Sequence, residues 1–166
     1  PTKPGKADTK FPFTDVSKND RYYDAVDYLY NNGIMNGTTD TLFSPNAELT
    51  RAMVVTILYR AQGKPAVSTS GSFKDVAAGR YYTEAVEWAA ANNIVKGFTD
   101  GTFKPDEPVT REQLAVVLYR YAQKKGYELA QDGPALKDFT DGNAVSGWAL
   151  EAMTWAVNTG VLTGKE

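Results

Sequence analysis

Two arginines stand at equivalent places in the chain, each where a helix is expected to begin. Arg51 follows Thr50 and Arg111 follows Thr110, and the two Thr-Arg pairs lie 60 residues apart. Each threonine is a candidate N-cap, so each arginine falls in a first helical turn, where the helix dipole disfavours a cation by roughly 0.3–1 kcal/mol. An unfavourable residue at the same place twice suggests a function. Because helix-start N–H groups and a guanidinium both bind anions, the pattern predicts an acidic ligand at each helix start.

A loop that begins with glycine and ends with proline precedes each Thr-Arg pair and must set its position. The first loop begins at Gly37, and the second runs from Gly97 through Gly101 to Pro105. Glycine tolerates positive φ, and proline fixes its own φ and has no N–H to donate. We therefore expect a tight loop that delivers the helix start.

The loop and the helix belong to a unit that recurs along the chain. The second unit copies the first at a constant offset of 60 residues without gaps, and the matched pairs include Asp15 with Asp75, Ala25 with Ala85, Ile34 with Ile94, Pro45 with Pro105 and Arg60 with Arg120. A third unit starts at Phe139-Thr140-Asp141 and carries no third Thr-Arg pair. A fixed internal period of this kind is typical of repeat architectures.

The repeats divide the chain into an arm and three units joined by linkers. The expected divisions are the arm at 1–12, unit one at 13–63, a linker at 64–72, unit two at 73–123, a linker at 124–135, and the first half of unit three at 136–166. Each complete unit is predicted to be helix–loop–helix, with Gly33 ending the first helix and the second helix running from about Thr50 to Gln62. One such hairpin cannot bury its apolar stripes alone, so we expect an all-α fold in which the units pack together as a bundle.

Composition excludes several function classes. The 166 residues carry a net charge of −2, which gives no electrostatic case for nucleic acid. No run of about 18 apolar residues is present, so membrane insertion is not expected. Histidine and cysteine are both absent. The commonest general base and metal ligand are therefore missing, and we expect no catalytic residues, no metal and no cofactor.

The repeated motifs resemble those of the S-layer homology family. The resemblance rests on Phe-x-Asp-Val near the start of a unit, on the Gly-x-x-Asp-Gly-x-Phe-x-Pro loop at 97–105, and on Thr-Arg opening the last helix. It covers nearly all of residues 13–164. It implies three motifs in a pseudo-threefold bundle that anchors an exported protein, outside the bacterial cell, to a secondary cell-wall polysaccharide. That glycan often bears a pyruvate ketal, whose carboxylate agrees with the acidic ligand predicted from the helix starts.

The resemblance also implies which residues bind the ligand. They are the Thr-Arg pairs, the early aspartate of each unit, a loop glycine, and the aromatic residue before a first helix: Thr50, Arg51, Thr110, Arg111, Asp15, Asp75, Asp141, Gly101, Tyr81 and Trp148. Unit one departs from the pattern, with Arg21 at the aromatic position and Thr41 at the glycine position.

Each of these residues also has a purely structural interpretation. The arginines could form ion pairs, for instance with Asp15 or Asp75, and an aspartate before a helix is commonly a cap or turn residue. The aromatic residues could belong to the core instead of stacking on a sugar. The loop aspartates Asp40 and Asp100 lack the regularly spaced oxygen ligands that a calcium loop needs.

Two other function classes stay open beside glycan anchoring. A protein-interaction or lattice-forming module would use the same grooves to bind neighbouring chains. A glycan hydrolase would need a pair of carboxylates, such as Glu84 and Glu87, although acidic pairs on exposed faces are usually only solvated.

The incomplete third unit carries a further expectation. Its helix bears Trp148, Met153, Trp155 and Val157, and each large side chain left exposed forgoes roughly 1.5–3 kcal/mol. Without a third Thr-Arg helix, this face is expected to need a partner from the other two units, from the residues before Phe13 or from another chain. We therefore predict lower stability than in a complete triple repeat, or self-association through this unit.

Overall fold

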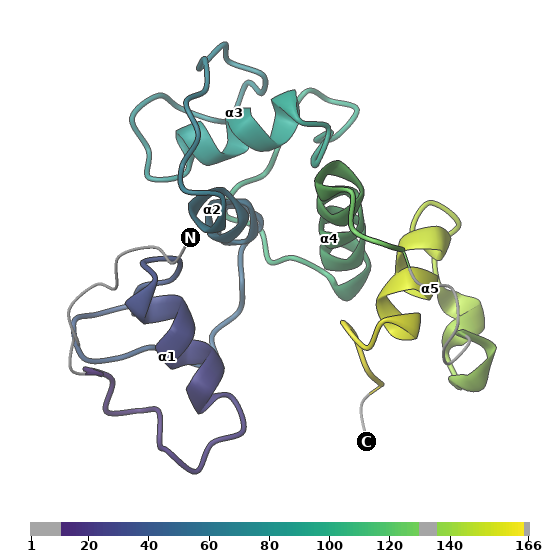
Figure 1. Cartoon of the computed structure of the whole chain (residues 1–166). Coiled ribbons are helices and arrows are strands. Elements are labelled where there is room, and N and C mark those ends of the chain that lie inside the picture. The colour runs from purple at the N-terminus through teal and green to yellow at the C-terminus, as the bar shows by residue number, and fades with distance from the viewer. Residues whose placement is uncertain (1–10, 130–135, 165–166) are drawn as a thin grey trace.

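The structure is a computed structural model that describes residues 11–129 and 136–164 (Figure 1). These residues form five α-helices, namely α1 (Tyr23–Asn31), α2 (Arg51–Ala61), α3 (Thr83–Ala91), α4 (Arg111–Lys125) and α5 (Leu150–Asn158). Two short 3-10 helices precede α5, at η1 (Leu136–Asp138) and η2 (Gly142–Ala144). No strand occurs in the described ranges, and the predicted all-α fold is confirmed.

The helix ends follow the local sequence signals. The Thr50 hydroxyl accepts a hydrogen bond from the Met53 N–H at 3.3 Å, and Thr110 does the same for Gln113 at 3.2 Å. The Gln113 side chain in turn accepts from the Thr110 N–H, which completes a capping box. Gly33 follows the C-cap of α1 with a φ of 66°. The predicted N-caps and the predicted end of the first helix are therefore confirmed.

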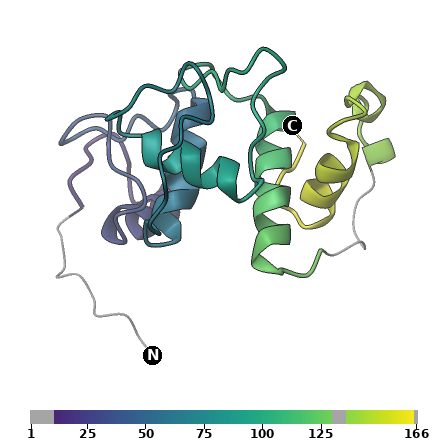
Figure 2. The same ribbon diagram turned by 90° about the horizontal axis from the view of Figure 1, so that it is seen from above.

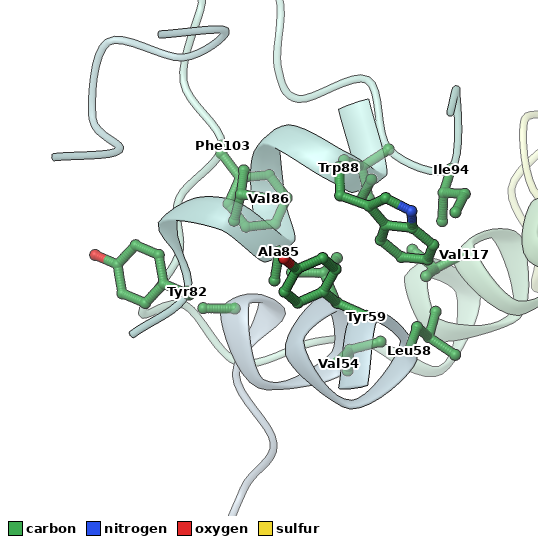
Figure 3. Packing of buried hydrophobic residues seen from close by; sticks show 14 of the residues in the cluster. Val54, Leu58, Tyr59, Tyr82, Ala85, Val86, Trp88, Ile94, Phe103 and Val117 are labelled. Carbon is green, nitrogen blue, oxygen red and sulfur yellow. The ribbon is translucent and has the colours of Figure 1, made fainter. Parts of the chain in front are cut away.

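Each Thr-Arg helix packs on the first helix of the following unit. Helix α2 lies against α3, and α4 lies against α5 (Figures 1 and 2). Figure 3 shows the first of these interfaces, where Tyr59 of α2 faces Trp88 of α3, and where Val117 of α4 joins the cluster. Burying each large side chain contributes roughly 1.5–3 kcal/mol. The units are thus held together by helix pairs that cross from one unit to the next.

The two interfaces use the same polar and aromatic contacts. The Tyr59 hydroxyl donates to the Glu84 carboxylate at 3.1 Å, and its ring centroid lies 5.7 Å from that of Trp88. In the next interface the Tyr119 hydroxyl donates to Glu151 at 2.6 Å. The hydrogen bond to Glu151, aided by burial, raises the pKa of Tyr119 to about 12. Glu84 therefore has a structural role at the interface between units.

Helix α1 lacks such a partner among the described residues. Its Tyr28 is 61% exposed, whereas Trp88, 60 positions later, is 7% exposed. Ala25 is likewise exposed, and Ala85 is buried. Helix α1 packs instead on its own unit, around Phe13.

The helix of the third unit takes its partner from unit two, which is one of the three sources that the sequence left open. Val157 of α5 is buried, and Met153 and Trp155 pack partly against the cluster formed with α4. Each first helix with a preceding unit uses the Thr-Arg helix of that unit, so α5 packs on α4, whereas among the described residues α1 has no equivalent partner. Self-association stays a prediction, and within the described residues the less covered first helix is α1.

A buried carboxylate of α3 accepts hydrogen bonds from the 64–72 linker and holds the linker against the helix. Glu87 is 2% exposed and accepts hydrogen bonds from the Ser72 N–H at 2.9 Å, the Ser72 hydroxyl at 2.7 Å and the Ser70 hydroxyl at 3.2 Å. Burial acts to raise the pKa of Glu87, but the hydrogen bonds from Ser72 and Ser70 outweigh it, and the pKa is lowered from the ordinary value of 4.5.

Acid is expected to weaken this fastening. A lowered carboxylate pKa gives stability that is present above the unfolded-state pKa and is lost as the pH falls through the folded-state pKa. We expect the melting temperature of the wild type to drop below about pH 4.5, and the Glu87→Gln variant to lose the part of that drop due to Glu87. Thermal melts of both proteins from pH 7 to pH 2.5 test this. Parallel curves for the two proteins would contradict it.

Candidate ligand-binding groove

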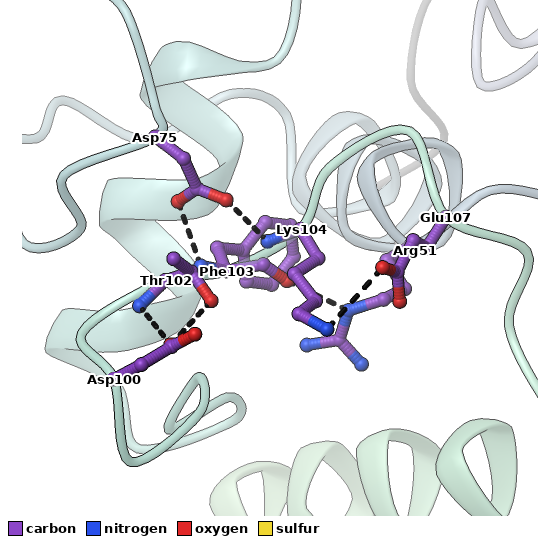
Figure 4. Close-up of polar contacts among 7 residues, drawn as sticks. All are labelled: Arg51, Asp75, Asp100, Thr102, Phe103, Lys104 and Glu107. Carbon is purple, nitrogen blue, oxygen red and sulfur yellow. Dashed lines mark hydrogen bonds and ion pairs between the residues drawn. The ribbon is translucent and has the colours of Figure 1, made fainter.

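The aspartate at the start of each complete unit holds the loop of that unit closed. The Asp75 carboxylate accepts hydrogen bonds from the N–H groups of Phe103 and Lys104, both at 2.7 Å (Figure 4). Asp15 makes the equivalent bonds to the N–H groups at 43 and 44, at 2.9 and 2.7 Å. The bond from the Phe43 amide is the main cause that lowers the pKa of Asp15. The backbone of the loop is thereby fixed in front of the next helix.

The N–H groups at the start of α2 are already satisfied by protein atoms. Those of Arg51 and Ala52 donate to the carbonyl oxygens of Glu107 and Pro105, at 3.0 and 2.9 Å. That of Met53 donates to its cap. The expectation that backbone N–H groups at this helix start are open to an anion is therefore wrong for α2. The loop of unit two occupies them, and only the arginine side chain remains for an anion.

The guanidinium of Arg51 sits in a cage formed by the loop of unit two. Its Nε donates to the Phe103 carbonyl at 2.8 Å, and its Cζ lies 4.8 Å from the ring centroids of both Phe98 and Phe103. Arg51 forms no direct ion pair with Asp15 or Asp75, although the charges of Glu107 and Asp75 favour its protonated form. Figure 4 shows the two terminal nitrogens on the side of the guanidinium away from Asp75. These nitrogens can donate to a bound group.

The positive charge of Arg51 is partly buried. Burial lowers the pKa of its guanidinium, whereas the carboxylates of Glu107 and Asp75 act to raise it. A guanidinium in a protein nevertheless stays protonated. A partly dehydrated positive charge is stabilised by a carboxylate or phosphate that binds it in a forked geometry.

Arg51 lines a groove of about 240 Å³ that brings three units together, and we call it the Arg51 groove. Unit one contributes Arg51, unit two contributes its loop and α4, and unit three contributes an aromatic side chain. The lining residues are Arg51, Val95, Lys96, Gly97, Phe98, Gln113, Val116, Val117, Arg120 and Trp148.

The lining of the Arg51 groove is positively charged. Among the described residues it contains three cations, Arg51, Lys96 and Arg120, and no carboxylate. Burial lowers the pKa of Arg120 as it does that of Arg51. Trp148 is 61% exposed, so its ring can stack on a ligand. The groove is therefore suited to a ring-shaped ligand that carries negative charge.

A second cavity, of about 410 Å³, is built from the equivalent positions of unit one, and we call it the Tyr81 cavity. Each residue of unit two that lines the Arg51 groove has its counterpart, 60 positions earlier in unit one, in the lining of the Tyr81 cavity. Tyr81 takes the place of Trp148. The lining residues are Ile34, Met35, Asn36, Gly37, Thr38, Phe43, Ser44, Pro45, Ala47, Glu48, Leu49, Met53, Thr56, Ile57, Arg60 and Tyr81. Arg51 has no counterpart there.

Arg111 has different surroundings from Arg51. It is exposed, it donates from Nη2 to the Thr163 carbonyl at 2.5 Å, and it lines neither the Arg51 groove nor the Tyr81 cavity. The loop residues that enclose Arg51 come from the 97–105 segment of the following unit. For Arg111 the described part of unit three ends at Gly164, the counterpart of Gly97.

The other predicted site residues take up structural positions. Thr50 and Thr110 cap helices, and Gly101 adopts a φ of 79° in a turn whose carbonyl accepts from Lys74 at 3.1 Å. Asp141 precedes η2. Of the residues predicted from the sequence, the structure brings only Arg51 and Trp148 into one groove, and it places Tyr81 in the other.

Sequence reasoning missed Arg120 and Lys96 as candidate binding residues. A signal for Arg120 was present, because arginine recurs at 60 and 120 within otherwise apolar helix patterns and has no carboxylate three or four residues away on its helix. Lys96 gave no such signal, because unit one has Asn36 at its position.

Two features are absent from the described ranges, a cluster of metal-binding side chains and a membrane-spanning helix. No group of three or more His, Cys, Asp or Glu side chains is placed there to hold a metal ion. None of the helices described is both long and apolar enough to cross a membrane.

Comparison with known proteins agrees with the repeat pattern. A family model described as the S-layer homology domain matches residues 12–52, 72–115 and 138–166. This chain belongs to the S-layer homology family. The resemblance inferred from the motifs is thereby confirmed.

Relatives of this S-layer homology chain include both surface proteins and enzymes. It is 33% identical over 112 residues to the surface-layer 125 kDa protein of Lysinibacillus sphaericus, covering 65% of this chain and 10% of that protein. It is 31% identical over 96 residues to a cellulosome-anchoring protein of Acetivibrio thermocellus, covering 55% of this chain and 22% of that one. It is 33% identical over 147 residues to an endoglucanase of a Bacillus species, covering 86% of this chain but only 15% of the enzyme.

These matches show what kind of module the chain is. The chain spans only 8–15% of the length of the first three relatives, which are named as enzymes, and it matches them through an S-layer homology region. S-layer homology units are non-catalytic, and the chain is an extracellular module of the bacterial cell surface that serves anchoring.

Proposed function

We propose that this S-layer homology chain attaches an exported protein to the bacterial envelope by binding an acidic wall polysaccharide in the Arg51 groove. The observation that carries the proposal is the lining of this groove, in which three cations and an exposed tryptophan meet and no carboxylate is present. A pyruvate ketal on a sugar ring supplies the matching carboxylate. The proposed role is binding without catalysis.

The groove can recognise both parts of such a sugar. The terminal nitrogens of Arg51 would donate to the carboxylate, and Lys96 and Arg120 would add positive charge beside it. The face of Trp148 would pack on the apolar side of the sugar ring. At about 240 Å³ the groove is smaller than the roughly 300–1,000 Å³ sites of drug-sized ligands, which suits one sugar unit of a longer chain.

Binding to purified wall polysaccharide tests the proposal directly. Isothermal titration of the chain with the intact glycan is expected to show binding, and chemical removal of the ketal pyruvate is expected to abolish most of it. Equal binding to both glycans would overturn the acidic-ligand proposal. Capture of wall protein but not of glycan would favour the lattice-forming alternative, and turnover of the glycan would favour a hydrolase.

The affinity is expected to depend little on pH near neutrality and noticeably on salt. The chain has no histidine or cysteine, and a sugar-linked carboxylate titrates at about pH 3–4. The charges on both partners are therefore constant between pH 6 and pH 8. Raising the ionic strength should weaken binding, because the exposed Lys96 is screened. Titrations at three pH values and three salt concentrations check this, and a steep pH dependence would point to different site chemistry.

A further inference from the structure

We propose that the Tyr81 cavity is a second carbohydrate site that takes an uncharged sugar unit, whereas the Arg51 groove takes the acidic one. The inference rests on the proposed function, since it assigns different units of the same glycan to the two sites. The two sites are lined by equivalent positions of units one and two, and they differ in the charge of the sugar that they would accept.

The two sites share the same arrangement of lining residues. Each is lined by a loop glycine, Gly37 or Gly97, and by an arginine of a Thr-Arg helix, Arg60 or Arg120. An exposed aromatic ring from the next unit also lines each site, and Tyr81 is 59% exposed. A site that can stack a sugar ring is therefore present twice.

The charge of the two linings differs. The position of Lys96 is held by Asn36 in unit one, and Arg51 has no counterpart. Glu48 lines the Tyr81 cavity, at the position that Pro108 holds in unit two. The cavity thus has one cation, Arg60, and one carboxylate, which makes its lining neutral. An acidic sugar there would meet a like charge and would lose two of the three cations.

The remaining groups of the Tyr81 cavity suit an uncharged sugar. Phe43, the counterpart of Phe103, lines the cavity. The hydroxyls of Thr38 and Ser44 lie 2.6 Å apart and can each make a further hydrogen bond to a sugar hydroxyl. Met53, 37% exposed, offers an apolar surface for a group such as an acetamido methyl. A neutral N-acetylated sugar matches these features.

The experiment compares two kinds of probe, uncharged and acidic, on the full chain. The probes are the methyl glycosides of N-acetylglucosamine and N-acetylmannosamine, each with and without a 4,6-pyruvate ketal. Backbone amide shifts in NMR titrations report the affinity of each site separately. We expect the uncharged probes to shift residues around Tyr81 and the ketal probes to shift residues around Arg51.

Two matched variants and one gain-of-function variant sharpen the test. Tyr81→Ala is expected to weaken the uncharged probes by about five-fold and to leave the ketal probes unchanged. Arg51→Ala is expected to weaken the ketal probes by about ten-fold to one-hundred-fold and to leave the uncharged probes unchanged. The double variant Asn36→Lys with Glu48→Gln should add a second site for the ketal probes. Thermal melts show whether each variant is folded.

The outcomes separate this inference from the proposed function. Ketal probes that bind both sites of the wild type with equal affinity would overturn the inference alone. So would uncharged probes that are indifferent to Tyr81→Ala. If ketal probes and intact polysaccharide both fail to bind the folded chain, the proposed function fails and the inference fails with it.

Discussion

Replacing Arg51 with alanine is expected to weaken binding of the acidic glycan by about ten-fold to one-hundred-fold. A hydrogen bond to a charged group contributes roughly 1.5–3 kcal/mol, and every 1.4 kcal/mol corresponds to about ten-fold in affinity. Arg51 is partly buried between two phenylalanine rings and lines the groove. Its loss therefore removes a charge-assisted contact in a partly dehydrated setting.

Arg111→Ala is the matched control. The residue occupies the same place in its helix, but it is exposed and lines neither site. Its replacement is expected to change affinity by about five-fold or less, because an exposed charge contributes at most about 1 kcal/mol. The sequence predicted ligand contact by both arginines, and the two variants together test that prediction.

Stability measurements keep the test on Arg51 interpretable. Arg51 also donates to the Phe103 carbonyl, so part of its role is structural. Arg51→Lys keeps the positive charge but loses the forked donor geometry, and it should bind with intermediate affinity. Unchanged affinity in folded Arg51→Ala would refute ligand contact. A collapse of the melting temperature, together with full binding at low temperature, would assign Arg51 to the fold alone.

Gly97→Ala is expected to destabilise the chain by about 2–5 kcal/mol. Gly97 has a φ of +66°, where a side chain costs roughly 1–2 kcal/mol. A Cβ there would lie 2.3 Å from Cε1 of the buried Phe73 and 2.6 Å from the Thr102 carbonyl oxygen. Relieving that overlap adds roughly 1–3 kcal/mol, because the core beneath the loop has to move.

Gly101→Ala separates the two costs. Gly101 has a φ of +79°, but a Cβ there meets nothing within 4 Å. Its replacement should cost only the backbone strain of roughly 1–2 kcal/mol. Thermal or urea unfolding of the two variants measures the difference. Equal losses of stability would show that contact with Phe73 is not what requires glycine at position 97.

The sequence alone determined the local structure of this chain. The threonine caps, the glycine at the end of α1, and the positive φ of Gly97 and Gly101 follow from residue chemistry that acts over a few positions. The 60-residue period and the Thr-Arg pairs were enough to identify the family and the all-α fold. Such signals are readable because they depend only on neighbours in the chain.

Only the tertiary structure decided which residues share a site. Arg51 and Arg111 each follow a capping threonine at a helix start, yet Arg51 is enclosed by a loop 52 residues away and Arg111 is exposed. The same loop occupies the N–H groups of α2 that the sequence left open to an anion. Trp148 enters the Arg51 groove because α5 packs on α4, the Thr-Arg helix of the preceding unit. The local pattern could not predict these outcomes, because burial and charge at each site are set by packing between units.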